Sequence, residues 1–222
     1  PEDYGYGWWV SDPAEEEIGF VQAAGAGGQL IKVLPDLDMV IVTTGGGSET
    51  DQIDPYVIAA IGDLGQSLPA DPAGEAALQA AIDEIVRPPA ATAVAAMPDT
   101  ASQISGKTYA LEENALGLEW FQLLFDQPDE ALLQFQVAGE ADPRQLAVGL
   151  DGVYRSAPEG ARPGLARGGW EDETTFVMEY DTLPGYEHFT FRMDFSGDRV
   201  AFELAERVWG TRAALEGAVQ EP

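Results

Sequence analysis

The second half of the chain alternates apolar and polar residues over short stretches that turn residues separate. The alternation is clearest from Leu133 to Val137 and from Phe189 to Phe195, where every second side chain is large and apolar. A period of two places such side chains on one face of a β-strand. Asp142-Pro143 and Ser196-Gly197-Asp198 are turn sequences between these runs. From about Ser102 onwards, the pattern predicts an antiparallel sandwich or small barrel without helices.

The first half contains short apolar runs around a glycine-rich turn. Phe20 to Ala24 and Leu30 to Leu34 flank Gly25 to Gly28, and Met39 to Val42 follows the turn sequence Pro35-Asp36. Glycine allows the backbone to turn sharply, and β-branched residues favour strands. We expect two strands around the glycine turn and a third, core strand after it.

Two helices are predicted after these strands, because each begins with an aspartate followed by proline. Asp54-Pro55 and Asp71-Pro72 supply an N-cap and a first helical residue, and Pro88-Pro89 ends the second helix. Apolar residues recur at helical spacing in the second helix and predict a packed stripe: Leu78, Ala81, Ile82, Ile85 and Val86.

These patterns predict an α+β chain. Antiparallel strands and two helices occupy residues 1–89, an alanine- and proline-rich linker occupies 90–101, and an all-β antiparallel barrel or sandwich occupies 102–222. The 222 residues and the 45% hydrophobic content are sufficient for two modest cores.

Composition limits the possible functions. The formal net charge is −28, from 11 basic and 39 acidic residues, which disfavours nucleic acids and anionic membranes as partners. No stretch approaches the ~20 apolar residues of a membrane span. Cysteine is absent, and His188 is the single histidine, so neither thiolate chemistry nor a multi-histidine metal site is available. We expect no metal and no cofactor.

Three segments resemble the C-terminal part of the β-lactamase-related serine hydrolases, which include class C β-lactamases, penicillin-binding proteins and esterases. They are Tyr-Gly-Tyr-Gly-Trp-Trp at Tyr4 to Trp9, the glycine-rich segment Gly25 to Gln29, and Pro-Asp-Leu-Asp-Met-Val from Pro35. In that family, a glycine-rich strand can replace the Lys-Thr-Gly box, whose backbone N–H groups help to form the oxyanion hole. The resemblance therefore implies a substrate-binding wall at Gly25, Ala26, Gly27, Gly28 and Gln29.

The two other boxes of that family are missing. Ser-x-x-Lys is absent because Gln29 and Ile104 stand three residues before the only lysines, Lys32 and Lys107. Tyr-x-Asn is absent because Glu112 stands two residues before Asn114. No residue of this chain is therefore assigned a catalytic role, and we expect the chain to be the C-terminal fragment of a longer hydrolase.

The resemblance implies a complete protein that cleaves a small ester or amide through an acyl-serine intermediate, with the missing N-terminal part as this chain's partner. It favours an extracytoplasmic location and a lipocalin-like β-domain after the linker. The alternative, of another class, is a non-catalytic β-barrel module that binds a ligand or partner. A structural protein of a salt-adapted envelope is a third possibility, based on charge alone.

Overall fold

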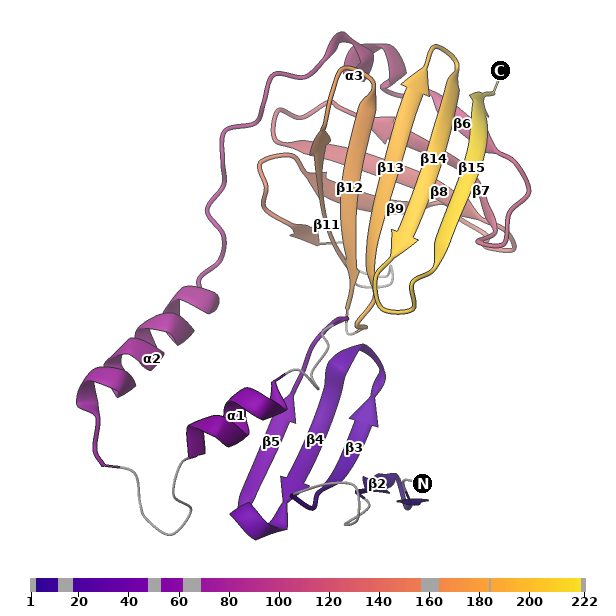
Figure 1. Ribbon diagram of the computed structural model, residues 1–222. Helices are drawn as coiled ribbons and strands as arrows, with labels where there is room; N and C mark the ends of the chain where they lie inside the picture. The colour runs from indigo at the N-terminus through magenta and orange to yellow at the C-terminus, as the bar shows by residue number, and fades with distance from the viewer. Residues whose placement is uncertain are drawn as a thin grey trace. The chain divides into compact units, whose positions relative to one another are not determined.

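The computed structural model describes residues 3–11, 18–47, 53–61, 69–156, 164–183 and 185–220. The chain divides into two compact units, Pro1–Pro88 and Pro89–Pro222 (Figure 1). Strands dominate the described part of the second unit, whereas the described part of the first unit combines a five-stranded sheet with two α-helices. The prediction of an all-β antiparallel barrel or sandwich in the second half of the chain is confirmed, whereas the prediction of an α+β hydrolase fold is not.

The first unit is built on an antiparallel sheet with the strand order β1-β2-β3-β4-β5 in its described residues. Its elements are β1 (Asp3–Gly5), β2 (Trp8–Val10), β3 (Val21–Gly25), η1 (Ala26–Gly28), β4 (Gln29–Leu34), η2 (Pro35–Leu37), β5 (Met39–Thr43), α1 (Asp54–Ile61) and α2 (Pro72–Ile85).

The three strands expected around the glycine turn are present as β3, β4 and β5. Gly27 and Gly28 have φ angles of 75° and 89°, a left-handed conformation that glycine adopts without steric cost. The expectation of a core strand at Met39–Val42 is wrong, because Val40 and Val42 are 59% and 62% exposed. Only one face of β5 is partly covered, whereas the valines face solvent.

The two predicted helices are also present, and α2 has no buried residue. The Asp71 side chain caps α2 by accepting a hydrogen bond from the Gly74 backbone N–H at 3.0 Å. The expected packed stripe on α2 is not found, since Leu78, Ile82, Ile85 and Val86 are all exposed. None of the described helices is long and apolar enough to cross a lipid bilayer.

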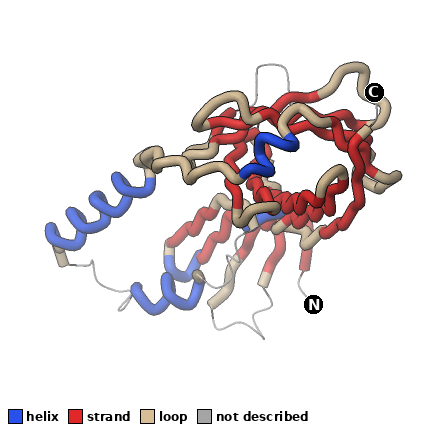
Figure 2. The backbone as a smooth tube through the Cα atoms, turned by 90° about the horizontal axis from the view of Figure 1, so that it is seen from above, coloured by secondary structure: helices blue, strands red, loops and turns tan. Residues whose placement is uncertain are grey.

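The second unit is a β-barrel. Its elements are α3 (Asp99–Ile104), β6 (Thr108–Leu111), β7 (Leu118–Leu124), β8 (Glu130–Val137), β9 (Arg144–Gly149), β10 (Arg155–Ser156), β11 (Gly164–Trp170), β12 (Thr175–Thr182), β13 (His188–Ser196), β14 (Arg199–Glu206) and β15 (Arg212–Val219). The described strands follow the order β10-β11-β12-β13-β14-β15-β6-β7-β8-β9, and β11 also pairs with β9. That pairing joins Arg167 to Gly149 in parallel and closes the ring seen in Figure 2. The barrel alternative is therefore correct and the sandwich is not.

Alternation along the barrel strands separates an inner from an outer face. On β14, for example, Val200, Phe202 and Leu204 are buried, whereas Ala201 and Glu203 between them are exposed. The inner residues form one continuous hydrophobic core. Helix α3 was not predicted, and it packs Ala101 and Ile104 into the interior with 2% of each exposed.

Candidate functional site: a cavity inside the barrel

The barrel encloses a cavity of about 530 Å³. Strands β7, β8, β9, β12, β13 and β14 supply most of the lining side chains, which are largely apolar. The lining residues are Leu118, Phe121, Leu133, Phe135, Arg144, Gln145, Leu146, Met178, Tyr180, Thr182, Leu183, Gly185, Glu187, Phe189, Phe191, Met193 and Phe202. We call this space the barrel cavity.

One end of the barrel is filled by aromatic side chains and is called the closed end. Trp170, Phe176 and Phe125 pack with ring centroids 5.4–5.6 Å apart. Tyr109 packs 5.4 Å from Phe195 beside them, and Ile104 of α3 joins the same core. Rings that interlock in this way leave no room for a ligand, so the barrel cavity occupies the rest of the interior.

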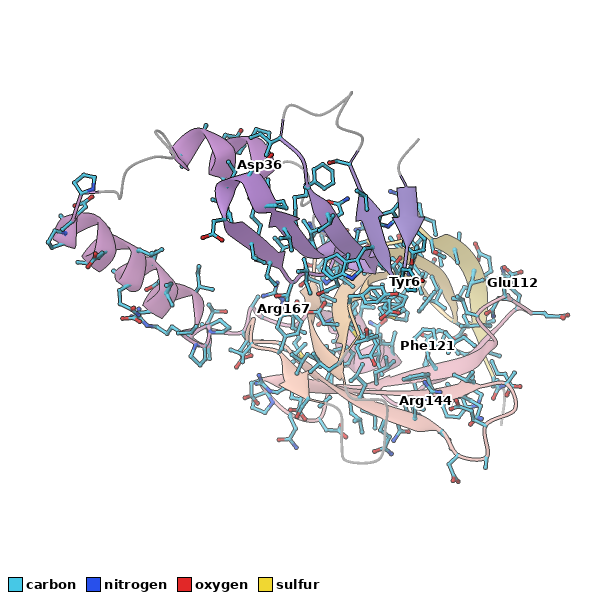
Figure 3. All side chains as sticks on the ribbon, turned by 90° about the horizontal axis from the view of Figure 1, so that it is seen from below. Tyr6, Asp36, Glu112, Phe121, Arg144 and Arg167 are labelled. Carbon is cyan, nitrogen blue, oxygen red and sulfur yellow. The ribbon has the colours of Figure 1, made fainter. Side chains whose placement is uncertain are left out.

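At the opposite end, which we call the polar end, charged side chains lie near the first or last residues of strands. Arg144 is the first residue of β9 and lies opposite Phe135 of β8, with its guanidinium carbon 6.0 Å from the ring centroid. Phe121 and Arg144 are labelled in Figure 3. Among the described residues that line the cavity, Arg144 is the one basic side chain.

Arg144 is paired with Glu140 of the loop between β8 and β9. Its Nε donates to Glu140 Oε2 at 2.6 Å, and its Nη2 contacts Glu140 Oε1. This hydrogen bonding raises the pKa of Arg144 above its ordinary value. Both carboxylate oxygens of Glu140 are thus engaged by a single guanidinium, which is the strongest geometry for such a pair.

Two further carboxylates lie at the polar end. Glu187 Oε2 accepts a hydrogen bond from the Thr182 hydroxyl at 2.6 Å, and both residues line the cavity. Glu206 is 4% exposed on the inner face of β14, directly across from Phe189. Its two oxygens accept the backbone N–H groups of Val208 and Trp209 at 2.7 and 2.6 Å, so they fix the turn after β14.

The outer face of β11, β12 and β13 carries a separate polar network. Arg167 donates from Nε to Glu179 at 2.8 Å and lies 4.6 Å from the centre of the Tyr154 ring. Although burial raises the pKa of Glu179, the hydrogen bond and charge of Arg167 hold it below its ordinary value. Burial, together with Asp181 and Glu179, raises the pKa of Tyr154 to about 12. These groups satisfy one another on the barrel wall and do not line the cavity.

His188 belongs to this outer face. Its Nδ1 lies 2.6 Å from Asp181 Oδ1, and the ring is partly buried. Across the described residues, no group of three or more histidine and acidic side chains is arranged to hold a metal ion. The network around His188 is therefore an assembly of pairs between neighbouring strands.

The substrate-binding wall expected at Gly25–Gln29 is the β3–β4 hairpin of the first unit. Gln29 Nε2 donates to the Gly45 carbonyl at 2.5 Å, the Thr43 hydroxyl donates to the Gly28 carbonyl at 2.9 Å, and Gly47 N–H donates to the Gly27 carbonyl. These bonds tie the hairpin to the end of β5. A role of Gly25, Ala26, Gly27, Gly28 and Gln29 in binding substrate stays a prediction without a test.

The residues that line the cavity were not predicted as a site. The alternation of the phenylalanines on β13 indicated an inner face, but it gave no indication of empty space inside. Arg144 was overlooked, although it is in phase with Leu146 and Val148, which are both buried. A charged residue in phase with buried neighbours at the start of a strand is the signal that would have found it.

No family model matches the sequence, and the search of curated proteins found no match. Among the solved structures that match, one is secretory abundant heat soluble protein 4 from Ramazzottius varieornatus, at 8% identity and a TM-score of 0.38, over 46% of this chain and 69% of that one. Another is a fatty acid binding protein from Schistosoma mansoni in complex with arachidonic acid, at 9% identity and a TM-score of 0.42, over 54% of this chain and 98% of that one.

Neither of these two structures is a hydrolase by its description. No hydrolase family model matches the chain, and its second unit is a closed β-barrel. The assignment to the β-lactamase-related serine hydrolases is wrong, and nothing supports a missing N-terminal hydrolase part as a partner. The segments behind it are the β1–β2 hairpin, the β3–β4 hairpin and the turn between β4 and β5, features that many antiparallel sheets contain. The second unit has the β-barrel on which the other function left open by the sequence depends, a non-catalytic module that binds a ligand or partner.

Proposed function

We propose that the second unit binds a small, mainly apolar molecule inside the barrel. The observation that carries this proposal is the barrel cavity of about 530 Å³, because protein interiors are normally close-packed and leave few voids larger than a water molecule. Ligand pockets typically measure about 300–1,000 Å³ and combine apolar walls with a few polar groups. The barrel cavity has both properties.

The lining indicates how a ligand would lie. Leu133, Phe191 and Met193 present only apolar side chains to the cavity, so a polar group placed among them would lose its hydrogen bonds to water. Arg144, Thr182 and Glu187 supply hydrogen-bonding groups at the polar end. An amphipathic molecule with its apolar part towards the closed end and its head group at the polar end satisfies both regions.

Binding can be tested with N-phenylnaphthylamine, an uncharged dye whose fluorescence rises in apolar surroundings. We expect the full chain to bind the dye at one saturable site. Leu133→Phe adds bulk inside the barrel cavity and is expected to weaken dye binding about tenfold or more, the effect of roughly 1.4 kcal/mol of lost binding free energy. Ala201→Leu adds comparable bulk on the exposed face of β14 and serves as the matched control.

The proposal would be overturned if dye binding were absent, or if Leu133→Phe and Ala201→Leu bound the dye equally well. The thermal midpoint of each variant shows whether the barrel is folded. Since Leu133→Phe fills existing space, we expect its midpoint to stay near that of the wild-type chain.

A further inference from the structure

A row of aromatic rings runs along one side of the barrel cavity. Its members, which all line the cavity, are Tyr180 of β12, Phe189 and Phe191 of β13, Phe202 of β14 and Phe121 of β7. In this order, each ring centroid lies 5.7–6.2 Å from the next. We call these five residues the aromatic row. Four strands thus supply one continuous aromatic surface to the cavity.

The two rings on β13 face the empty space of the cavity. Phe189 and Phe191 are only partly buried, although they lie on the inner face of the strand. Phe195, further along the same face, is 2% exposed because the rings of Tyr109 and Trp170 pack beside it. The accessible ring surface of Phe189 and Phe191 is the surface that a bound molecule would cover.

Two methionines lie beside the aromatic row and also line the cavity. Met178 lies directly across from Phe191 in the pairing of β12 with β13. Met193 lies directly across from Phe202 in the pairing of β13 with β14. The thioether sulfur of methionine makes favourable contacts with aromatic rings, and its unbranched side chain adapts to the shape of its neighbours. The two methionines therefore extend the surface that favours an aromatic ligand.

The other side of the cavity is largely aliphatic. Leu133 of β8 and Leu146 of β9 form a cross-strand pair, and both line the cavity. Because the ring of described strands closes between β9 and β11, β8 and β9 lie about half-way round the barrel from β13 and β14. The one ring on β8 and β9 among the described lining residues is that of Phe135, beside Arg144 at the polar end. A flat molecule in the cavity can contact aromatic rings with one face and leucines with the other.

We infer that the barrel cavity is selective for planar aromatic ring systems, which it binds more tightly than their hydrophobicity alone accounts for. This inference rests on the proposed function and adds the chemical class of the ligand. Aromatic pairs in edge-to-face or offset-stacked arrangements contribute to affinity beyond the area that they bury, by about two- to tenfold for each pair. A saturated ring or an alkyl chain gains only the burial of its surface from the same side chains. A rigid ring system also loses less conformational freedom on binding than an alkyl chain does.

The test compares three uncharged alcohols with the same number of carbon atoms, namely 2-naphthylmethanol, decahydro-2-naphthylmethanol and 1-undecanol. In each of them the hydroxyl group is on a saturated carbon atom, so its hydrogen bonding is similar. The affinity of each alcohol is measured by displacement of N-phenylnaphthylamine from the full chain at neutral pH. It is then divided by the partition coefficient of that alcohol between hexadecane and water, which removes general hydrophobicity from the comparison.

We expect this normalised affinity to be about tenfold or more higher for 2-naphthylmethanol than for either saturated alcohol. An advantage below about threefold would overturn the inference. The proposed function would still stand in that case, because the alcohols would displace the dye from the cavity.

The variant Phe191→Leu tests whether the aromatic row causes the selectivity. It replaces a ring of the cavity lining by an aliphatic side chain, so the normalised advantage of 2-naphthylmethanol should fall about threefold or more. Phe195→Leu is the matched control, because it removes a ring from the same face of β13 at the closed end, away from the lining of the cavity. In this control the advantage should change less than about twofold. Equal advantages in the two variants would overturn the role of the aromatic row.

The advantage is a ratio of two affinities within one variant, so a smaller folded fraction lowers both affinities equally and cancels. If either variant does not fold, the comparison of the three alcohols on the wild-type chain still decides the question. If the dye binds but 2-naphthylmethanol does not displace it, the inference alone fails. If the dye itself finds no saturable site on the wild-type chain, the proposed function fails, and the inference with it.

Discussion

The ring of Tyr180 lies against the backbone of Gly164, so closely that a β-carbon at Gly164 would come within 2.3 Å of a ring carbon and 2.5 Å of the hydroxyl oxygen. Gly164 begins β11, where the next inward residue is also small, Ala166. Small residues on β11 thus make room for the larger inward side chains of β12. The position of Tyr180 at the edge of the barrel cavity depends on the missing side chain at Gly164.

Gly164→Ala is expected to push the Tyr180 ring away from β11, because real β-carbons do not approach other atoms so closely. The cost should be about 1–3 kcal/mol of unfolding free energy, the usual effect of overpacking. A double-mutant cycle with Tyr180→Ala measures the contact directly. In the Tyr180→Ala background the clash is gone, so adding Gly164→Ala should cost less than about 0.5 kcal/mol. Equal costs in both backgrounds would show that the two residues are not coupled.

Gly149 occupies the point where the barrel closes. A β-carbon there would lie 1.8 Å from the carbonyl oxygen of Val153, which belongs to the backbone and cannot move aside by a rotamer change. Gly149 is also the residue that pairs with Arg167 of β11. We expect Gly149→Ala to lower the unfolding free energy by more than about 3 kcal/mol, a loss typical of severe backbone conflict.

Gly169→Ala is the matched control for this prediction, since it lies on β11 and a β-carbon there would meet no atom within 4 Å. It should be neutral or stabilise by up to about 1 kcal/mol through the unfolded chain. Chemical denaturation of both variants gives the two free energies. A Gly149→Ala protein as stable as Gly169→Ala would contradict the close approach of Val153.

The barrel strands were predictable because alternation is a local property of the sequence. The turn at Ser196-Gly197-Asp198 was predicted, and Gly197 indeed has a φ of 63° between β13 and β14. The closure between β9 and β11 was not predictable, since it depends on one pair of residues, Gly149 and Arg167, that no local pattern connects. The sequence therefore left sandwich and barrel as equal alternatives.

Helix α3 and the barrel cavity were not predicted, because neither produces a local pattern in the sequence. Helix α3 has six residues, too few for helical periodicity to appear. The barrel cavity is a space between side chains from six strands. The composition of the sequence does not reveal such a space. The glycine hairpin was given a family meaning, although the left-handed conformations of Gly27 and Gly28 already account for those glycines.

The ion pair between Asp151 and Arg155 makes the stability of the barrel depend on pH in the acidic range. Arg155 donates to both oxygens of Asp151 at 3.1 and 3.0 Å, and the Val153 N–H donates to Oδ1. These bonds, chiefly those from Arg155, hold the pKa of Asp151 below its ordinary value. A carboxyl whose pKa is lower in the folded chain stabilises that state above its unfolded pKa of about 3.9, and the contribution disappears as the pH falls through the lower folded value.

Asp151→Asn keeps an oxygen for the Val153 N–H but removes the charge. The variant should have a lower thermal midpoint than the wild-type chain at neutral pH. The difference should shrink as the pH falls below about 4, because protonation then removes the same charge from the wild-type chain. Thermal midpoints of both proteins across this range test the prediction. A difference that does not depend on pH would mean that the charge of Asp151 contributes nothing.

The substitution Tyr→Phe is expected to change the unfolding free energy in opposite directions at two tyrosines of the barrel. Tyr109 is 1% exposed at the closed end, and its hydroxyl has no hydrogen-bond partner in the described part of the chain. Burial, with a smaller effect of Asp198, raises the pKa of Tyr109 to about 12. Tyr154 is different, because its hydroxyl donates to Glu179 Oε2 at 3.1 Å. The aromatic ring is retained in both Tyr→Phe variants, so each reports on the hydroxyl alone.

Tyr109→Phe should leave the unfolding free energy unchanged or raise it, since a buried, unpaired hydroxyl costs about 1–3 kcal/mol of desolvation that phenylalanine avoids. Tyr154→Phe should lower it by about 1 kcal/mol, because Glu179 loses a donor while the stacking of Arg167 on the ring persists. Urea denaturation measures both free energies, and an unchanged slope shows that the unfolding transition is the same. If Tyr109→Phe were the more destabilising of the two, its hydroxyl would have to be hydrogen-bonded in solution, and a buried water at the closed end would be the group to look for.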